Sequence, residues 1–153
     1  MGGLIFCYNR GMGKLFTVRR FATTADLGIH VSADSTANLL RGATWGMFAT
    51  MLDLSTVPHQ STSHLDIPID NPREMPVIFL NYLLYLFGAK GLVPLSFPRL
   101  EISRDKVSAE VEWGKVSAGT KFLGNEVKAV TYSLYRWEHA PGRRQRLRIV
   151  FDV

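Results

Sequence analysis

Residues 27–52, LGIHVSADSTANLLRGATWGMFATML, contain a change of hydrophobic period that decides the fold. Their first residues, LGIHV, alternate apolar side chains with small or polar ones, which is the period of a half-buried strand. From Leu39 onward the apolar residues recur at intervals of three and four, which is typical of one helix face. Ser35 stands where an N-cap is preferred. The stretch therefore predicts a strand followed directly by a helix.

Two glycines, Gly42 and Gly46, lie four residues apart in this predicted helix. Each weakens a helix by roughly 1 kcal/mol relative to alanine. Their spacing therefore indicates one side on which another backbone approaches closely, in a packed amphipathic helix. Before this region, residues 15–21 predict a strand that a short turn joins to residues 27–33.

A further strand and a second helix are predicted downstream. Residues 63–70, SHLDIPID, alternate in polarity, and Pro68 places this strand at an edge or at its own end. The preceding residues 55–63, STVPHQSTS, have the composition of a loop. Residues 71–91 predict a buried helix with Pro76 in its first turn. Its end is expected at a glycine. Its apolar run is interrupted by Asn81 and is too short to span a bilayer, which takes ~20 residues. The two candidates for that end are Gly88 and Gly91.

The remaining residues predict four strands in a meander, and no internal repeat stands out. Strands and helices do not alternate as in a parallel nucleotide-binding sheet. The expected fold class is therefore α+β, with an antiparallel or mixed sheet packed against two main helices. We expect residues 1–14 to form a poorly ordered leader and residues 15–153 to form a single domain. The four strands are expected within residues 92–103, 105–115, 125–138 and 143–153.

Composition narrows the classes of function. Of 153 residues, 46% are hydrophobic and 20% charged, which is enough apolar material for a sizeable core. The net charge of +5 favours contact with phosphates or with an acidic protein. Cys7 is the single cysteine, so an intrachain disulfide is excluded and a reducing cytoplasmic setting is expected. The apolar run at the start of the sequence covers only Leu4 to Cys7, which is far shorter than the apolar region of a secretory signal.

The common catalytic motifs are absent from the sequence. It has no P-loop, no G-x-G-x-x-G after a strand, no G-x-S-x-G and no H-E-x-x-H. The four histidines are scattered without ligand spacing. A metal-dependent hydrolase ranks low because no general base or nucleophile accompanies its acids. A self-contained enzyme active site is therefore hard to find in this sequence.

Two aspartates stand out at the ends of predicted strands. Asp26 shares the parity of His30, so it should point away from the core, and Asp152 lies on the non-core face of the last strand. If these strands are neighbours, both side chains and the carboxylate of Val153 converge. Oxygen ligands of this kind suit Ca²⁺ or Mg²⁺. The alternative is that both are ordinary strand-end acids, with Asp26 capping its turn.

Four segments occur in the order seen in the archease family, which the chain resembles over about residues 15–153. The resemblance implies a small α+β fold, a strand–helix–strand–strand module with a second such unit inserted. It implies an activator of the GTP-dependent RNA ligase that joins tRNA halves and repairs broken RNA, promoting guanylylation and turnover of the ligase. The four segments are TADLGI (24–29), LLYLFGAKG (83–91), NEVKAVTYS (125–133) and IVFDV (149–153).

The resemblance also implies roles for particular residues. The family's metal-binding positions correspond to Asp26, Asp152 and Val153, which would hold a Ca²⁺-type cation, and its functional lysine corresponds to Lys128. The chain departs from the family where many members have histidine, because it has Thr23 and Ser133. The predicted first helix also lacks the acids usual in its first turns.

A second functional hypothesis is a stand-alone RNA-binding module. Arginines near the C-terminus could follow a phosphate backbone beside aromatic rings on which bases stack. The alternative interpretation is a solvated hairpin face and, for the rings, core packing. The residues concerned are Arg143, Arg144, Arg146 and Arg148, with Tyr132, Tyr135 and Trp137.

Overall fold

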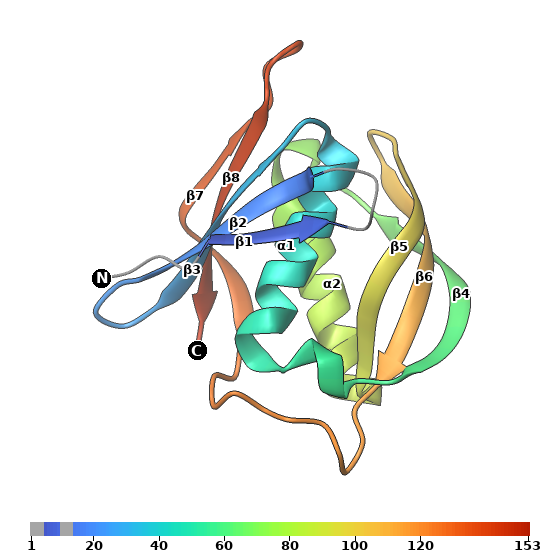
Figure 1. The fold of residues 1–153 in the computed structure, drawn as a ribbon. Coiled ribbons are helices and arrows are strands. Elements are labelled where there is room, and N and C mark those ends of the chain that lie inside the picture. The colour runs from blue at the N-terminus through green and yellow to red at the C-terminus, as the bar shows by residue number, and fades with distance from the viewer. Residues whose placement is uncertain (1–4, 10–13) are drawn as a thin grey trace. The chain divides into compact units, whose positions relative to one another are not determined.

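The computed structural model describes residues 5–9 and 14–153, with side chains described from residue 15 onward. Within these residues the chain forms eight strands and two α-helices, which confirms the α+β class (Figure 1). The elements are β1 (Ile5–Asn9), β2 (Lys14–Ala22), β3 (Leu27–Ala33), α1 (Thr36–Met51), β4 (His59–Pro68), α2 (Met75–Lys90), β5 (Leu92–Ile102), β6 (Lys106–Lys115), β7 (Ala129–Glu138) and β8 (Gln145–Asp152).

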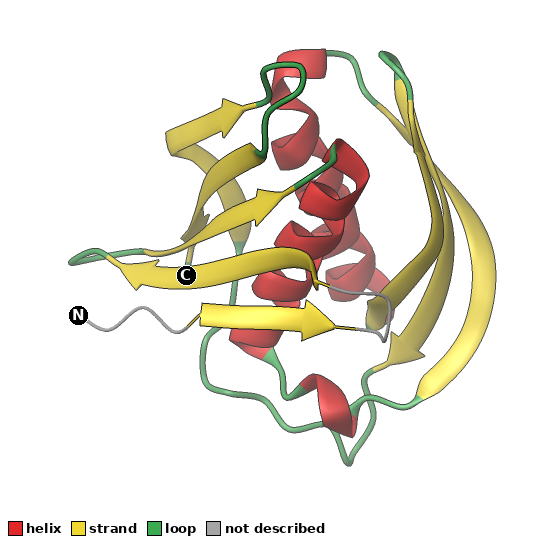
Figure 2. Cartoon of the chain, turned by 45° about the horizontal axis from the view of Figure 1, so that its top comes forward, coloured by secondary structure: helices red, strands yellow, loops and turns green. Residues whose placement is uncertain are grey.

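The chain divides into two compact units. Unit 1 comprises residues 1–47 and 127–153, and unit 2 comprises residues 48–126. Unit 1 contains a five-stranded sheet in the order β1-β2-β3-β8-β7, and unit 2 contains a three-stranded sheet in the order β4-β6-β5. Every pairing described is antiparallel. The expected single meander is wrong, because β7 and β8 do not continue the sheet of β4, β5 and β6; β8 pairs with β3, and β7 pairs with β8. Figure 2 shows the strands in yellow and the helices in red.

In unit 1, α1 packs very closely on one face of the sheet. A Cβ atom added at Gly42 would lie 2.7 Å from Cγ1 of Val31 and 2.9 Å from the ring of Phe16. One added at Gly46 would lie 2.9 Å from Cγ1 of Val18. Both glycines are therefore required by the approach of the helix to β2 and β3, as their spacing indicated.

The predicted start of the first helix and the predicted end of the second are confirmed, whereas α2 begins at Met75, later than the predicted residue 71. The Ser35 hydroxyl accepts a hydrogen bond of 3.1 Å from the backbone N–H of Asn38, which is N-capping of α1. Pro76 lies in the first turn of α2. Gly91, at φ 67°, ends α2 in the left-handed conformation, and its N–H donates to the carbonyl of Phe87. In the described part of the chain neither helix is long and apolar enough to cross a membrane.

β4 begins earlier than the sequence predicted. Residues 59–63 were expected in a loop, but they belong to this strand and pair with β6. Their polar composition reflects exposure at a sheet edge rather than irregular structure, since β4 is the edge strand and these residues are exposed. Pro68 is its last residue, as expected. β7 begins later than predicted, at Ala129, so residues 125–128 are not part of the strand.

The expected leader is part strand. Residues 5–9 form β1, which pairs antiparallel with β2, and Lys14 already belongs to β2. The edge of β2 that faces away from β3 supplies the backbone partners for this pairing. Residues 1–4 and 10–13 lie outside the described residues, so the expectation for them is untested.

Candidate functional site

The register of β2, β3, β8 and β7 places side chains in rows across the outer face of the unit 1 sheet. The residues that meet α1, such as Val18 and Val31, mark the inner face. Because side chains alternate along a strand, the residues between them lie on the outer face. His30, for example, lies there between β2 and β8, opposite Arg19 and Arg148.

Asp26 and Asp152 lie at the same end of adjacent strands. Leu27 pairs with Phe151, so Asp26 immediately precedes β3 where Asp152 ends β8. Asp152 pairs with Ala129 of β7, and its carbonyl accepts a hydrogen bond of 2.7 Å from the backbone N–H of Lys128. The two predicted carboxylates are thus neighbours along the backbone ladder. Lys128 and Val153 adjoin them, and both are exposed.

The turn before Asp26 is closed by Thr23 rather than by the aspartate. The Thr23 hydroxyl accepts from the Asp26 backbone N–H at 3.0 Å, and the Thr23 N–H donates to the Asp26 carbonyl at 2.9 Å. The carboxylates of Asp26 and Asp152 have no hydrogen bond or ion pair among the described residues. The capping alternative for Asp26 is therefore wrong, and Thr23 takes that structural task at a position where many relatives are expected to have histidine.

The donors at this end of the sheet match a hard cation in kind. They are carboxylate oxygens, which Ca²⁺ and Mg²⁺ prefer. Their number is small, because the described residues contain no group of three or more His, Cys, Asp or Glu side chains that could hold a metal ion. Ca²⁺ takes about six to eight oxygen ligands. Asp26 and Asp152 would therefore supply only part of a coordination shell.

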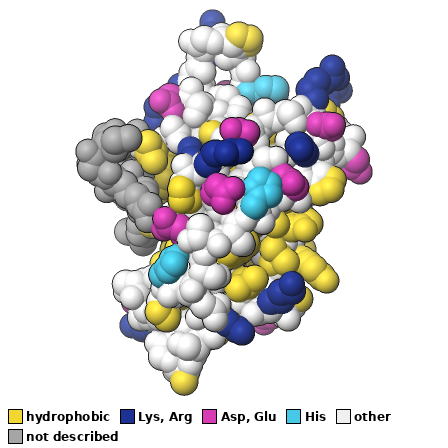
Figure 3. All heavy atoms as spheres, turned by 90° about the vertical axis from the view of Figure 1, so that its right-hand side faces the viewer, with side chains coloured by type: hydrophobic (Ala, Val, Ile, Leu, Met, Phe, Trp, Pro, Cys, Tyr) yellow, Lys and Arg dark blue, Asp and Glu magenta, His cyan; other side chains and the backbone are white. Residues whose placement is uncertain are grey.

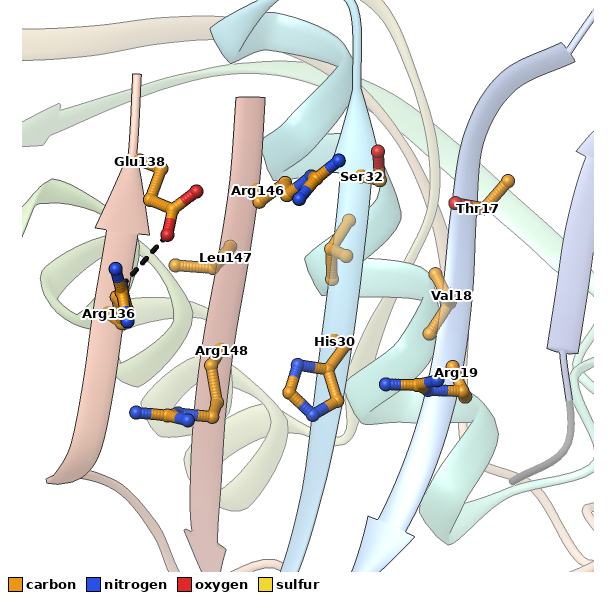
Figure 4. A pocket seen from close by; sticks show the side chains of 11 residues that line it. Thr17, Val18, Arg19, His30, Ser32, Arg136, Glu138, Arg146, Leu147 and Arg148 are labelled. Atoms are coloured by element: carbon orange, nitrogen blue, oxygen red, sulfur yellow. Dashed lines mark ion pairs between the residues drawn. The ribbon is translucent and has the colours of Figure 1, made fainter. Parts of the chain in front are cut away.

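A row of four basic residues crosses the same face further along the strands. Arg19 of β2 pairs with His30 of β3, His30 with Arg148 of β8, and Arg148 with Arg136 of β7. We call these four residues the basic row; Figure 4 shows them side by side on four strands. They line a shallow cavity of about 610 Å³. Burial, followed by the charges of Arg19 and Arg148, lowers the pKa of His30 below its ordinary value.

The next row is mixed in charge. It runs from Thr17 through Ser32 and Arg146 to Glu138, and Glu138 accepts from Nε of Arg136 at 2.9 Å. Arg146 and Arg148 of the predicted arginine strip thus line the cavity.

The other two arginines of the strip lie beyond the cavity lining. Nε of Arg144 donates to the Ser32 hydroxyl at 2.6 Å. Arg143 belongs to the turn, where its N–H donates to the carbonyl of Ala140.

Trp137 does not lie beside the arginines, as the RNA-binding hypothesis supposed. It pairs with Leu147, which is buried on the inner face, so its ring lies across the strand from Arg136. Its indole N–H donates to Oε1 of Gln145 at 3.1 Å. The ring is half-buried and stacks on the exposed His139, with 3.9 Å between the ring centroids.

A bulge in β7 exposes Tyr132, which is one of the other two predicted aromatic residues, together with Leu134. The register shifts between Thr131 and Arg136, and Tyr132 and Leu134 are 53% and 55% exposed. Leu134 has φ 54°, a left-handed conformation that is uncommon for leucine. Nε of Arg148 donates to the Leu134 carbonyl at 2.6 Å, which fixes the bulge against the basic row. Ser133 lies within the bulge.

Sequence reasoning missed Arg19, His30 and Arg136 as members of one site. Each is an ordinary residue of its own strand, and nothing in its spacing singles it out. The available signal was parity, which is clear for His30 between Ile29 and Val31 but obscured for Arg19, because Arg20 follows it. That signal becomes useful only when the pairing of β2, β3, β8 and β7 is known.

The sheet of unit 2 carries a different cluster on its exposed surface, and Figure 3 shows acidic and histidine side chains among basic ones on this side. His64 Nδ1 lies 3.0 Å from Oε1 of Glu110, and Nε2 lies 3.0 Å from Oδ1 of Asp66. The Ser108 hydroxyl donates to the same Asp66 oxygen at 2.6 Å. Hydrogen bonds to Glu110 and Asp66 raise the pKa of His64 above its ordinary value.

Comparison with known protein families decides the family. The family model of the Archease protein family matches residues 19–153. The chain belongs to the archease family. The archease of Danio rerio is 31% identical over 113 residues, which cover 72% of this chain and 70% of that protein. The archease of Ictalurus punctatus is 29% identical over 113 residues, with the same coverage.

Solved structures show that the archease fold is shared. The solution structure of a Methanobacterium thermoautotrophicum protein superposes with a TM-score of 0.72 at 20% identity, over 91% of this chain and 97% of that one. The crystal structure of a Thermotoga maritima archease, described as a possible chaperone, superposes with a TM-score of 0.62 at 20% identity, over 87% and 94% of the two chains.

Proposed function

We propose that this archease activates a GTP-dependent RNA ligase, promoting its guanylylation and its turnover in tRNA splicing or RNA repair. Membership of the family over residues 19–153 supports this role. The observation that carries it is the placement of Asp26 beside Asp152, since two carboxylates without described partners at one sheet end form a charged, accessible tip. The protein contributes no catalytic group and works on the active site of its partner.

The same tip is the proposed cation site. Asp26, Asp152 and the carboxylate of Val153 would hold Ca²⁺ or another hard divalent cation, which supplies positive charge for phosphate oxygens when bound. Because these donors cannot complete the coordination shell, the partner or its nucleotide would supply the missing oxygens. Lys128, next to Asp152 through its backbone hydrogen bond, would contact the partner's acidic or phosphate groups.

The decisive experiment is multiple-turnover RNA ligation by the host's GTP-dependent ligase, with archease added substoichiometrically. Wild type is expected to stimulate product formation, and Asp26→Ala to lower the stimulation at least about tenfold, as loss of a ligand lowers metal affinity. Asp70→Ala is the matched control, because Asp70 is an exposed aspartate of unit 2. Stimulation by Asp26→Ala equal to that by wild type would contradict the proposed site.

Two further experiments test the proposed cation site and the proposed partner separately. Titration calorimetry with Ca²⁺ is expected to give heat of binding with wild type and less with Asp152→Asn. If wild type fails to stimulate a competent ligase, the paired change Thr23→His with Ser133→His tests whether the family's histidines determine the partner. Stimulation restored by the histidines would establish a changed partner, and no stimulation in either form would overturn the activator role.

A further inference from the structure

The basic row is continuous across four strands. Neighbouring strands lie about 4.8 Å apart, so Arg19, His30, Arg148 and Arg136 extend over roughly 14 Å. Arg146 adds a further cation in the adjoining row, and the hydroxyls of Thr17 and Ser32 line the same cavity. Their common direction makes the outer face of the unit 1 sheet one extended surface of hydrogen-bond donors (Figure 4).

This arrangement places like charges side by side, and the described residues neutralise them only in part. Arg148 and Arg136 are directly opposite on paired strands, where like charges destabilise a sheet. Glu138 is the one acidic residue in the cavity lining, and its carboxylate is engaged with Arg136. The side chains of Arg19 and Arg146 have no ion pair among the residues whose side chains are described. The guanidinium groups of Arg19 and Arg146 are therefore available to an external anion.

The surroundings of the row favour a nucleic acid strand over an acidic protein segment. Guanidinium groups present planar forks that match phosphate oxygens. Phe21 lies at the edge of the row with its ring centroid 4.7 Å from that of His30, and the exposed Tyr132 stands in the β7 bulge. An open sheet with cations and aromatic rings is the arrangement with which proteins hold single strands by their phosphates and bases.

We propose that the outer face of the unit 1 sheet binds single-stranded RNA, with the basic row and Arg146 on consecutive phosphates and with Phe21 and Tyr132 beside the bases. This binding is independent of the ligase role and needs neither ligase nor cation. Asp152 follows Arg148 by four residues of β8, so the carboxylate tip lies about 13 Å from the row on the same face. A bound strand would thus run close to that tip.

The test is fluorescence anisotropy of a labelled single-stranded RNA of about 12 nucleotides, titrated with archease alone in EDTA at several salt concentrations. Wild type is expected to bind with a slope of log affinity against log salt of about −0.7 for each phosphate contact. Arg19→Gln and Arg146→Gln are each expected to reduce that slope by about 0.7 and to weaken binding about eightfold at 50 mM salt.

Arg99→Gln is the matched control, because Arg99 is an exposed arginine on β5 of unit 2, paired with Glu101 at 3.2 Å. It should bind RNA as wild type does. Circular dichroism melting identifies any variant that has failed to fold, and Arg19→Lys then tests charge without the guanidinium fork. Absence of binding by folded wild type at low salt would overturn the proposal. An equal loss of RNA affinity in Arg99→Gln would also overturn it. So would a competition in which a polyglutamate peptide displaces the labelled RNA at a lower concentration of negative charges than unlabelled RNA does.

Because ligase and cation are both absent from this assay, its result is separate from that of the ligation experiment. If the protein binds RNA but does not stimulate the ligase, the proposed RNA-binding surface stands and the proposed activator role is overturned.

Discussion

The two units of the molecule have the same connectivity and opposite surface chemistry. β3, α1, β7 and β8 of unit 1 follow the order strand, helix, strand, strand, and so do β4, α2, β5 and β6 of unit 2. The last strand is central in each case, in the orders β3-β8-β7 and β4-β6-β5. Unit 1 adds the hairpin β1-β2 at its edge. The insertion thus repeats the topology of its host, although no repeat stands out in the sequence.

A histidine in the first strand of each module shows that a shared topology does not determine the direction of a pKa shift. His30 on the first strand of the module faces Arg148 on the last, whereas His64 in the corresponding strand of unit 2 faces Glu110. The pKa of His30 is lowered and that of His64 is raised. The common topology therefore places a histidine in the same kind of position twice. Burial and then the charges of Arg19 and Arg148 lower the pKa of His30, whereas hydrogen bonds to Glu110 and Asp66 raise the pKa of His64.

The largest expected effect tests whether the two units fold as one. Phe79 of unit 2 and Phe151 of unit 1 are both fully buried. Phe79→Ala and Phe151→Ala should each lower the free energy of unfolding by about 3–5 kcal/mol. Because α1 runs without interruption from residue 36 to residue 51 across the boundary between units, amide protection should fall in both units in each variant. Hydrogen exchange measures this.

Tyr85→Ala is the control for these truncations, because that side chain is 69% exposed, and it should change stability by less than about 0.5 kcal/mol. Exchange that rises only in the unit that carries the substitution would show two independent folding units and would contradict the expected cooperation.

A smaller effect distinguishes the helices of the two units. Gly42→Ala in α1 should destabilise the protein by about 1–3 kcal/mol, because the new methyl group would overlap Val31 and Phe16. Gly88→Ala in α2 should stabilise it by up to about 1 kcal/mol, since nothing lies within 4 Å of an added Cβ there. Urea denaturation measures both. Equal signs for the two substitutions would show that α1 can move away from β2 and β3.

The smallest effect concerns the two histidines and pH. Because the folded pKa of His64 is raised, its contribution to stability is fully present below its ordinary value near 6.5 and is lost as pH rises through the folded pKa. The Tm advantage of wild type over His64→Gln should therefore shrink as pH rises. His30 has a lowered folded pKa, so wild type should lose Tm relative to His30→Gln as pH falls below 6.5. Parallel pH profiles for the two variants would refute this contrast.

Local features of the fold were predictable from the sequence because short-range chemistry determines them. The Ser35 cap, the close approach at Gly42 and the edge position of Pro68 follow from the properties of single residues and their spacing. The β4 start was mispredicted because polar residues are equally compatible with a loop and with an exposed edge strand.

Features that depend on pairing were less accessible. Asp26 and Asp152 lie close together only because β3 and β8 are neighbours. That pairing had to be assumed, because the sequence alone could not predict it. The basic row required three registers at once, so His30 and Arg136 passed unnoticed. The Leu134 bulge has no sequence signal, because leucine rarely adopts the left-handed conformation that the strand imposes there. The proposed cation and RNA sites both depend on this long-range information.

The interruption of unit 1 by unit 2 also has a consequence for synthesis. Residues 48–126 leave the ribosome as one continuous stretch, so all three strands of the unit 2 sheet are available before β7 and β8 exist. β3 must wait for β8, its partner across more than a hundred residues, and contacts so distant in the chain form slowly. Until β8 is synthesised, one edge of β3 is unpaired. The nascent protein then contains all strands of unit 2 but only part of unit 1. Neither the carboxylate tip nor the full basic row exists until that last strand arrives, so a truncated chain that lacks β8 would lack both surfaces.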